Sequence, residues 1–192
     1  MRLIIISGKI GSGKSTLSKC FEKKGYHYID SDKLAKDLIL NSKPIRDKLV
    51  NEFDILKKEN IISLKKLKIL FLSSKDNKNK INSIIHPFFY KKLNILVKSY
   101  KNKIVIELPL IETRNNIMSK FEIVTLETKL NIRKKRYLDK MPSKTEDFMI
   151  LNRYQKSYTY YKNSSDYVIS NNDTMELLKM RFNKLYSKFK NE

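Results

Sequence analysis

The stretch Gly8-Lys9-Ile10-Gly11-Ser12-Gly13-Lys14-Ser15 decides the fold of this 192-residue chain. It fits the pattern of Gly, four residues, Gly, Lys and then Ser or Thr that defines a phosphate-binding P-loop. An apolar run at residues 3–6 precedes it and predicts a strand, and residues 15–24 follow with the apolar spacing of a helix. Because a P-loop requires this strand, loop and helix setting, a chance glycine-rich turn is the weaker interpretation.

The residue types of the loop suit a bound nucleotide. Glycines let the backbone curl so that successive N–H groups point into one hollow, and the following helix adds its positive dipole end. We expect Lys14 to reach the outer phosphates of ATP and the Ser15 hydroxyl to bind the Mg²⁺ that bridges them. The motif predicts these ATP-binding residues: Gly8, Gly11, Ser12, Gly13, Lys14, Ser15 and Thr16.

Two carboxylates follow the next predicted strand, at residues 26–29. Asp30 and Asp32 lie where that strand gives way to a helix. In an open parallel sheet this place is beside the phosphate loop, where a carboxylate can accept the proton of an attacking hydroxyl or hold a magnesium-bound water. An Asp that only caps the helix around Leu34 would look the same, so the residues alone leave both roles open.

The rest of the chain alternates strands and helices. Residues 34–100 read as mostly helical, with breaks at Pro44, around 73–79 and at Pro87. Strands alternating with helices predict an α/β fold, a parallel sheet covered on both faces, for which we expect five strands. The remaining predicted strands are 103–108, 121–126 and 167–170, and the remaining predicted helices are 129–140, 145–154 and 174–189.

The composition is that of a globular chain with a large positive charge. It has 41 Lys and Arg against 20 Asp and Glu, a formal net charge of +21. Such a charge raises the alternative of an ATP-dependent nucleic-acid-binding module. Almost all of these cations are Lys spread along the chain, so we expect no specific nucleic-acid partner. No apolar run could span a bilayer, none resembles a signal peptide, and Cys20 is a lone cysteine, which together predict a cytosolic protein without membrane contact.

Several short motifs occur in a specific order: the P-loop continued to Thr16, Tyr28–Asp32, Ile85–Pro87, Pro109–Glu112, Arg136 with Lys140, Gln155, and Asp166–Asn171. Together they resemble the dephospho-CoA kinase family, whose members use ATP to phosphorylate the ribose 3′-hydroxyl of dephospho-CoA in the last step of coenzyme A biosynthesis. The resemblance runs nearly end to end. It implies a P-loop kinase of the nucleoside-monophosphate-kinase type, with ATP, Mg²⁺ and dephospho-CoA as its ligands. Another nucleoside or nucleotide kinase on this scaffold is the alternative.

The resemblance also implies a division of the single kinase domain. The core would comprise residues 1–32, 102–127 and 156–192. A helical acceptor-binding region would occupy residues 33–101, and a lid that closes over ATP would occupy residues 128–155.

The same resemblance assigns roles to five side chains outside the loop. Asp32 corresponds to the family's catalytic base and Asp30 to its companion at the substrate. Arg136 corresponds to the lid arginine that, with the P-loop lysine, neutralises charge on the transferring phosphoryl group. Asn171 corresponds to the residue beside the adenine of ATP, and His86 lies in the region associated with the acceptor. Without the resemblance, Arg136 reads as a solvated helix face and Asn171 as a turn residue, and His86 reads as a structural histidine or as the start of a helix.

Four positions depart from the family pattern or vary it. Lys9 stands where Gly is usual, which brings a second ammonium near the phosphates. The Pro109–Glu112 motif is one residue shorter than usual, and residues 62–64 replace a usual Leu-Asp-Arg. Glu107 stands where an Asp is common and could order Mg²⁺ through water, although a charge at the edge of the sheet is the plain alternative.

Overall fold

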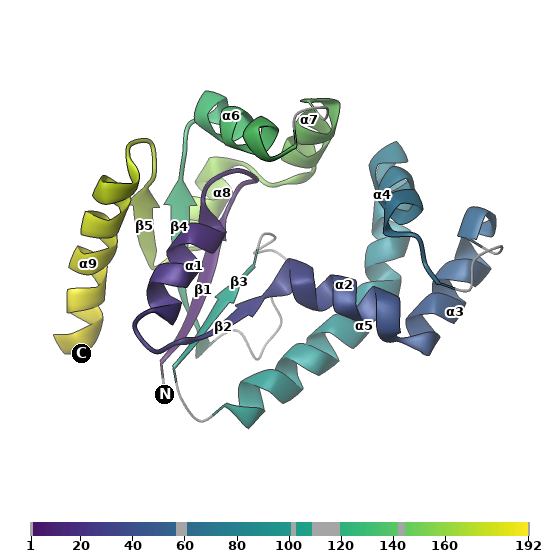
Figure 1. Cartoon of the computed structure of the whole chain (residues 1–192), viewed down its shortest axis with the longest axis horizontal. Coiled ribbons are helices and arrows are strands. Elements are labelled where there is room, and N and C mark those ends of the chain that lie inside the picture. Colours follow the sequence, from purple (N-terminus) through teal and green to yellow (C-terminus); the bar gives the residue numbers. More distant parts are fainter. Residues whose placement is uncertain (1, 57–60, 101–102, 109–119, 142–144, 192) are drawn as a thin grey trace. The chain divides into compact units, whose positions relative to one another are not determined.

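The computed structural model describes the whole chain except residues 1, 57–60, 101–102, 109–119, 142–144 and 192, and the side chains of 190 and 191. It divides into two compact units (Figure 1). The first comprises Met1–Asp30 and Tyr100–Glu192, and the second comprises Ser31–Ser99. Each unit is described by itself. No helix in the described ranges has both the length and the apolar character needed to cross a membrane.

The first unit contains a five-stranded sheet in which every pairing is parallel. The strand order is β2-β3-β1-β4-β5. The carboxyl ends of all strands therefore meet at one edge, where the loop after β1 lies. The α/β fold with five parallel strands is thus confirmed. The strands are β1 (Leu3–Gly8), β2 (His27–Asp30), β3 (Ile104–Glu107), β4 (Glu122–Glu127) and β5 (Tyr167–Ser170).

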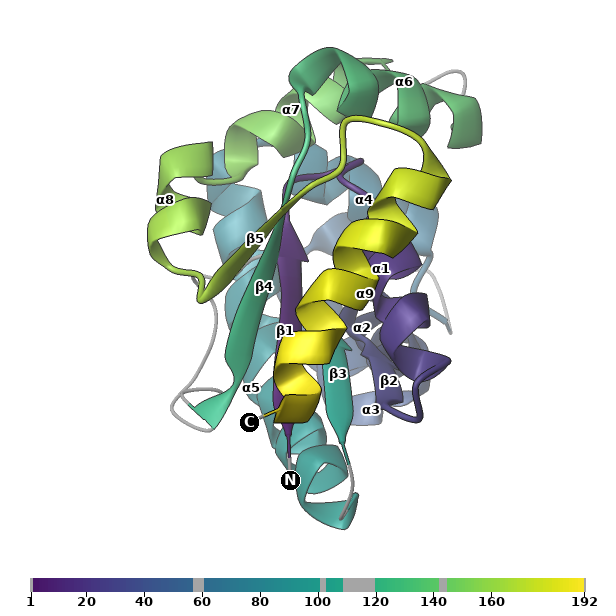
Figure 2. The same ribbon diagram turned by 90° about the vertical axis from the view of Figure 1, so that its left-hand side faces the viewer.

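Helices cover both faces of this sheet (Figure 2). On one face α1 (Lys14–Glu22) and α9 (Met175–Asn191) bury an apolar core that includes Phe21, Phe182 and the even-numbered β1 residues Ile4 and Ile6. On the other face lies α8 (Tyr158–Asn163), whose Tyr161 is fully buried. Side chains of a strand alternate between faces, and each β1 residue is buried, so the continuous apolar run reflects burial on both sides.

Two further helices follow β4 in the first unit, namely α6 (Leu130–Lys140) and α7 (Thr145–Tyr154). They pack through Phe148, which is fully buried. The ring of Tyr137 lies 5.5 Å from that of Phe148, and the Arg133 guanidinium lies 5.9 Å from the centre of the same ring. The side chains facing Phe148 from α6 stand four residues apart, which places them on one face of the helix.

The second unit is helical. Its long helix α5 (Lys75–Ser99) packs against α2, α3 and α4 and buries every fourth residue from Ile81 to Val97. The expected break at Pro87 is wrong, because α5 continues through it. An interior proline costs about 3 kcal/mol, and this regular apolar face offsets that cost. The other elements are α2 (Ser31–Asn41), α3 (Lys43–Glu52), a 3₁₀ turn (Asp54–Leu56) and α4 (Leu64–Ser73).

Candidate active site

The loop after β1 takes a shape that only glycine adopts easily. Gly11 and Gly13 have φ angles of +77° and +95°, and Gly8 has +141°. The space at these positions is also full. A Cβ on Gly11 would lie 2.4 Å from the Arg133 carbonyl oxygen, and one on Gly13 would lie 2.4 Å from Nδ2 of Asn171. The glycines are therefore fixed both by backbone conformation and by close neighbours.

The N-terminus of α1 is open toward this loop. Its N-cap residue is Gly13, so no side chain accepts a hydrogen bond from the first turn. The Ser12 hydroxyl is buried and has no hydrogen-bond partner among the described residues. Uncapped amides and an unsatisfied hydroxyl around a glycine cradle are what a polyphosphate chain requires, so the residues present fit ATP.

Three predicted side chains lie in the first turn of α1. Lys14 is 8% exposed, and its ammonium donates to the carbonyl oxygen of Lys9 at 3.3 Å, across the loop. Ser15 and Thr16 are half-buried. In the described part of the chain, no cluster of three or more His, Cys, Asp or Glu could hold a metal ion. Mg²⁺ bound mainly through phosphates and one hydroxyl needs no such cluster, so Ser15 fits it.

Residues that directly follow β4 and β5 hold the loop by hydrogen bonds to its backbone. Nδ2 of Asn171 donates to the Ser12 carbonyl at 2.8 Å, and the Thr128 hydroxyl donates to the same oxygen at 3.2 Å. Nη1 of Arg136 donates to the Asn171 carbonyl at 3.1 Å. The structure therefore brings Arg136 and Asn171 together beside Gly13. Arg136 is half-buried, so the solvated-face interpretation of this side chain is wrong.

A second anchor was not expected from the residues. Nη1 of Arg133 donates to the Ile10 carbonyl at 3.2 Å and to Oδ1 of Asn152 at 2.9 Å, while its Nε donates to the Thr128 carbonyl at 3.0 Å. Oε1 of Gln155 accepts from the Ile10 amide at 2.8 Å. The two polar groups of Ile10 are thus held by α6 and by the end of α7. The sequence held one signal for this anchor: Arg133 stands four residues before the aromatic Tyr137, which places both on the same face of the helix.

At the next strand edge, Asp30 and Glu107 are register partners at the carboxyl ends of β2 and β3. The Tyr28 hydroxyl donates to Oε2 of Glu107 at 2.6 Å. Burial and this carboxylate raise the pKa of Tyr28 well above its ordinary value, so the phenol stays protonated and holds the carboxylate. Glu107 is therefore an oriented carboxylate next to β1.

Asp32 and His86 belong to the second unit. Asp32 is exposed in the first turn of α2, which begins at Ser31, so the helix starts three residues before Leu34. His86 is half-buried in the middle of α5, and burial together with Lys78 lowers the pKa of this imidazole. The interpretation of His86 as the start of a helix is therefore wrong.

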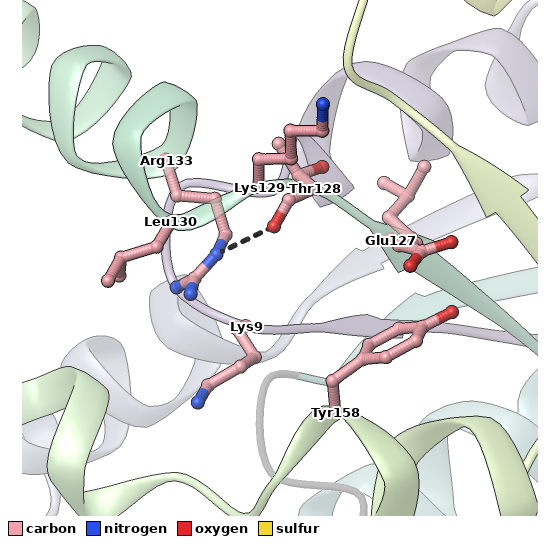
Figure 3. Close-up of a pocket in the computed structure, with 8 residues that line it drawn as sticks. Lys9, Glu127, Thr128, Lys129, Leu130, Arg133 and Tyr158 are labelled. Carbon is pink, nitrogen blue, oxygen red and sulfur yellow. Dashed lines mark hydrogen bonds between the residues drawn. The ribbon is translucent and has the colours of Figure 1, made fainter.

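The departures from the family pattern have different outcomes. The Ser63 hydroxyl caps α4 by accepting from the Lys66 amide at 3.3 Å, which explains the serine among residues 62–64. The Pro109–Glu112 motif lies outside the described residues. Lys9 lines a hollow together with Arg133 and Tyr158, among others (Figure 3).

A comparison with known families decides the identity of this site. The family model described as CoaE, dephospho-CoA kinase, matches residues 2–176. The chain belongs to the dephospho-CoA kinase family. A dephospho-CoA kinase from Fusobacterium nucleatum is 31% identical over 181 residues, which cover 91% of each chain.

Solved structures agree with the dephospho-CoA kinase family in fold. The dephospho-CoA kinase from Campylobacter jejuni superposes with a TM-score of 0.68 at 21% identity, covering 98% of both chains. A structure from Thermus thermophilus reaches a TM-score of 0.75 at 20% identity with the same coverage. The family resemblance seen in the motifs is thus confirmed, and the chain is a kinase.

Proposed function

We propose that this chain transfers the γ-phosphoryl group of ATP to the ribose 3′-hydroxyl of dephospho-CoA, which yields coenzyme A. The observation that carries the proposal is the glycine loop at the open end of α1, in a chain of this family. Its buried, unsatisfied Ser12 hydroxyl and its uncapped amides suit a polyphosphate. We place this reaction in the cytosol, with ATP and dephospho-CoA as small-molecule partners.

The nucleotide end of the site is assigned as follows. The amides of Gly8–Ser15 and the ammonium of Lys14 bind the β- and γ-phosphates, and the Ser15 hydroxyl would hold Mg²⁺. When bound, Mg²⁺ supplies charge neutralisation on the phosphate oxygens. Arg136 and Asn171 lie against Gly13. Asn171 is assigned to the loop that flanks the adenine, and Arg136 offers positive charge to the transferring phosphoryl group.

Asp32 is assigned as the base that receives the proton of the 3′-hydroxyl. It follows Asp30 by two residues, a length of chain that spans at most about 7 Å. Its side chain is exposed at the start of α2. Asp30 and His86 are assigned to the acceptor side, and Glu107, held by Tyr28, to water molecules around Mg²⁺. Residues 128–155 are assigned as the lid, which excludes water that would otherwise hydrolyse ATP.

The substrate assignment is tested by incubating the chain with dephospho-CoA and γ-labelled ATP and locating the label in the product by mass spectrometry and NMR. We expect a single phosphate on the ribose 3′-oxygen. Turnover of a nucleoside or nucleotide, with none of dephospho-CoA, would contradict this substrate and leave the ATP site standing.

The base is tested with Asp32→Asn, for which we expect turnover to fall at least about 10³-fold while ATP affinity stays within about twofold. Asp37→Asn is the matched control, because Asp37 is also an exposed carboxylate on α2. Full turnover in Asp32→Asn would remove Asp32 from the mechanism. An equal loss in both variants would assign the effect to the helix instead.

A further inference from the structure

A hollow of about 280 Å³ lies on the first unit where β4 ends and α6 begins. This volume is just below the range of about 300–1,000 Å³ for drug-sized ligands, so it suits a small ligand. Its walls come from three parts of the chain that are distant in sequence, namely the P-loop, residues 126–133 and the start of α8 (Figure 3). The lining residues are Lys9, Leu126, Glu127, Thr128, Lys129, Leu130, Arg133 and Tyr158.

The charges around this hollow do not balance. Lys9, Lys129 and Arg133 carry three positive charges, and Glu127 carries the one negative charge among the lining residues, which leaves a surplus of two. The carboxylate of Glu127 is already engaged by the Tyr158 hydroxyl. Burial and the nearby Arg133 guanidinium lower the pKa of Lys9, which shows that the two cations repel each other.

Several donors remain unused in the hollow. Within the described residues, nothing accepts a hydrogen bond from the Lys9 ammonium or pairs with it. Nε of Arg133 donates to the Thr128 carbonyl, and Nη1 donates to the Ile10 carbonyl and to Asn152. Its Nη2 has no acceptor among the residues that the structure describes. Arg133 is only 5% exposed, so its guanidinium is fixed in place before any ligand arrives.

We propose that this hollow binds a small phosphate dianion, separately from the ATP site. A phosphate monoester or inorganic phosphate carries about −1.5 to −2 charges at pH 7, which matches the surplus of two, and its oxygens accept from both an ammonium and a guanidinium. The Tyr158 ring supplies a flat wall against which an organic group of a monoester can lie. Because Arg133 also holds Ile10, the bound dianion contacts the same side chain that ties α6 to the P-loop.

The test separates this site from the P-loop, which binds phosphate as well. The protein is saturated with Mg²⁺ and a non-hydrolysable ATP analogue, and inorganic phosphate is then titrated by calorimetry, with glycerol 3-phosphate and acetate in parallel. We expect one further binding event per chain for the two phosphates, weaker binding of acetate, and at least about tenfold loss of phosphate affinity in Lys9→Met. Tighter binding of glycerol 3-phosphate than of inorganic phosphate would identify a monoester as the ligand.

Two further variants keep the result unambiguous. Lys9→Arg retains the charge and should restore phosphate binding, and Lys135→Met removes an exposed lysine of α6 that does not line the hollow and should leave binding unchanged. The proposal is overturned by any of three results. These are no second event up to about 10 mM phosphate, equal binding by the wild type and Lys9→Met, and acetate binding as tightly as phosphate. Failure of the ATP analogue to bind would instead count against the proposed function. Phosphate would then be titrated into the Lys14→Met variant, in which the P-loop has lost its lysine.

Discussion

The lack of space beside Gly11 in the phosphate loop gives a quantitative prediction. In Gly11→Ala, the new Cβ would sit at a φ of +77°, which costs an alanine about 1–2 kcal/mol. It would also lie 2.4 Å from the Arg133 carbonyl oxygen, a backbone atom that cannot move without displacing α6. Relief of such overpacking costs a further 1–3 kcal/mol or so. We expect a total loss of about 2–5 kcal/mol in the free energy of unfolding and weaker ATP binding.

Gly25 offers a matched control within the same unit. Its φ is +85°, close to that of Gly11, but nothing lies within 4 Å of a Cβ built there. Gly25→Ala should therefore lose only the conformational cost of about 1–2 kcal/mol and keep its ATP affinity. The assay is guanidinium unfolding of both variants and the wild type, with ATP affinity from calorimetry. Equal losses of stability in the two variants, or normal ATP affinity in Gly11→Ala, would refute the argument that the Arg133 carbonyl of α6 leaves no space for a side chain at residue 11.

Three more predictions concern single side chains. Burial and Glu127 raise the pKa of Tyr158 to about 12 from 10.0, so the stabilisation from its neutral phenol is complete below pH 10 and is lost as the pH rises toward 12. The free energy of unfolding of the wild type should therefore fall more steeply with pH than that of Tyr158→Phe between about pH 10 and 12, and parallel pH dependences would contradict this. Pro87→Ala should raise the free energy of unfolding, measured by thermal unfolding, by about 1–3 kcal/mol, because Pro87 is exposed inside α5. A lower free energy of unfolding would show that the proline ring makes stabilising packing contacts. Tyr28→Phe should lower the free energy of unfolding, measured with urea, by about 1 kcal/mol, because it removes the hydrogen bond to Glu107. An unchanged free energy would mean that water replaces the phenol as the donor to this carboxylate.

The strands and the loop could be predicted because each signal there is local. A β-branched run before the glycines and a carboxylate pair after the second strand need only sequence spacing, and the structure has β1 and β2 within one or two residues of the expected bounds. Gly25 was likewise a correct end signal for α1, since the Tyr26 amide bonds back to the Phe21 carbonyl around it.

Errors arose where packing outweighed local preference. Pro87 normally interrupts a helix, but its neighbours Ile85 and Phe89 belong to the buried face that holds α5 together. The short helix α8 was missed because six residues give too few turns for an apolar period, and only Tyr161 is buried. Charged runs also mislead, because the Arg and Lys residues of α6 look equally solvated in sequence whereas Arg133 is buried.

The candidate site was predictable only in part, for the same reason. The loop residues follow from a motif, whereas the contacts that hold the loop come from residues more than a hundred positions away, such as Asn171 on Ser12 and Gln155 on Ile10. The positions of Arg136 and Asn171 came from a family resemblance and not from any pattern of charge or spacing. The placement of Asp32 opposite an acceptor stays a prediction.

The way the chain leaves and re-enters the first unit limits how its helical unit could be exchanged. Residues 31–99 depart from the carboxyl end of β2 and return just before the amino end of β3, and these two strands are parallel neighbours. The two attachment points thus lie at opposite ends of neighbouring strands, roughly 10 Å apart along the strand direction. A chimera that grafts another helical module onto this sheet would need a connection that runs the length of a strand, so a short hairpin-like splice should yield misfolded protein.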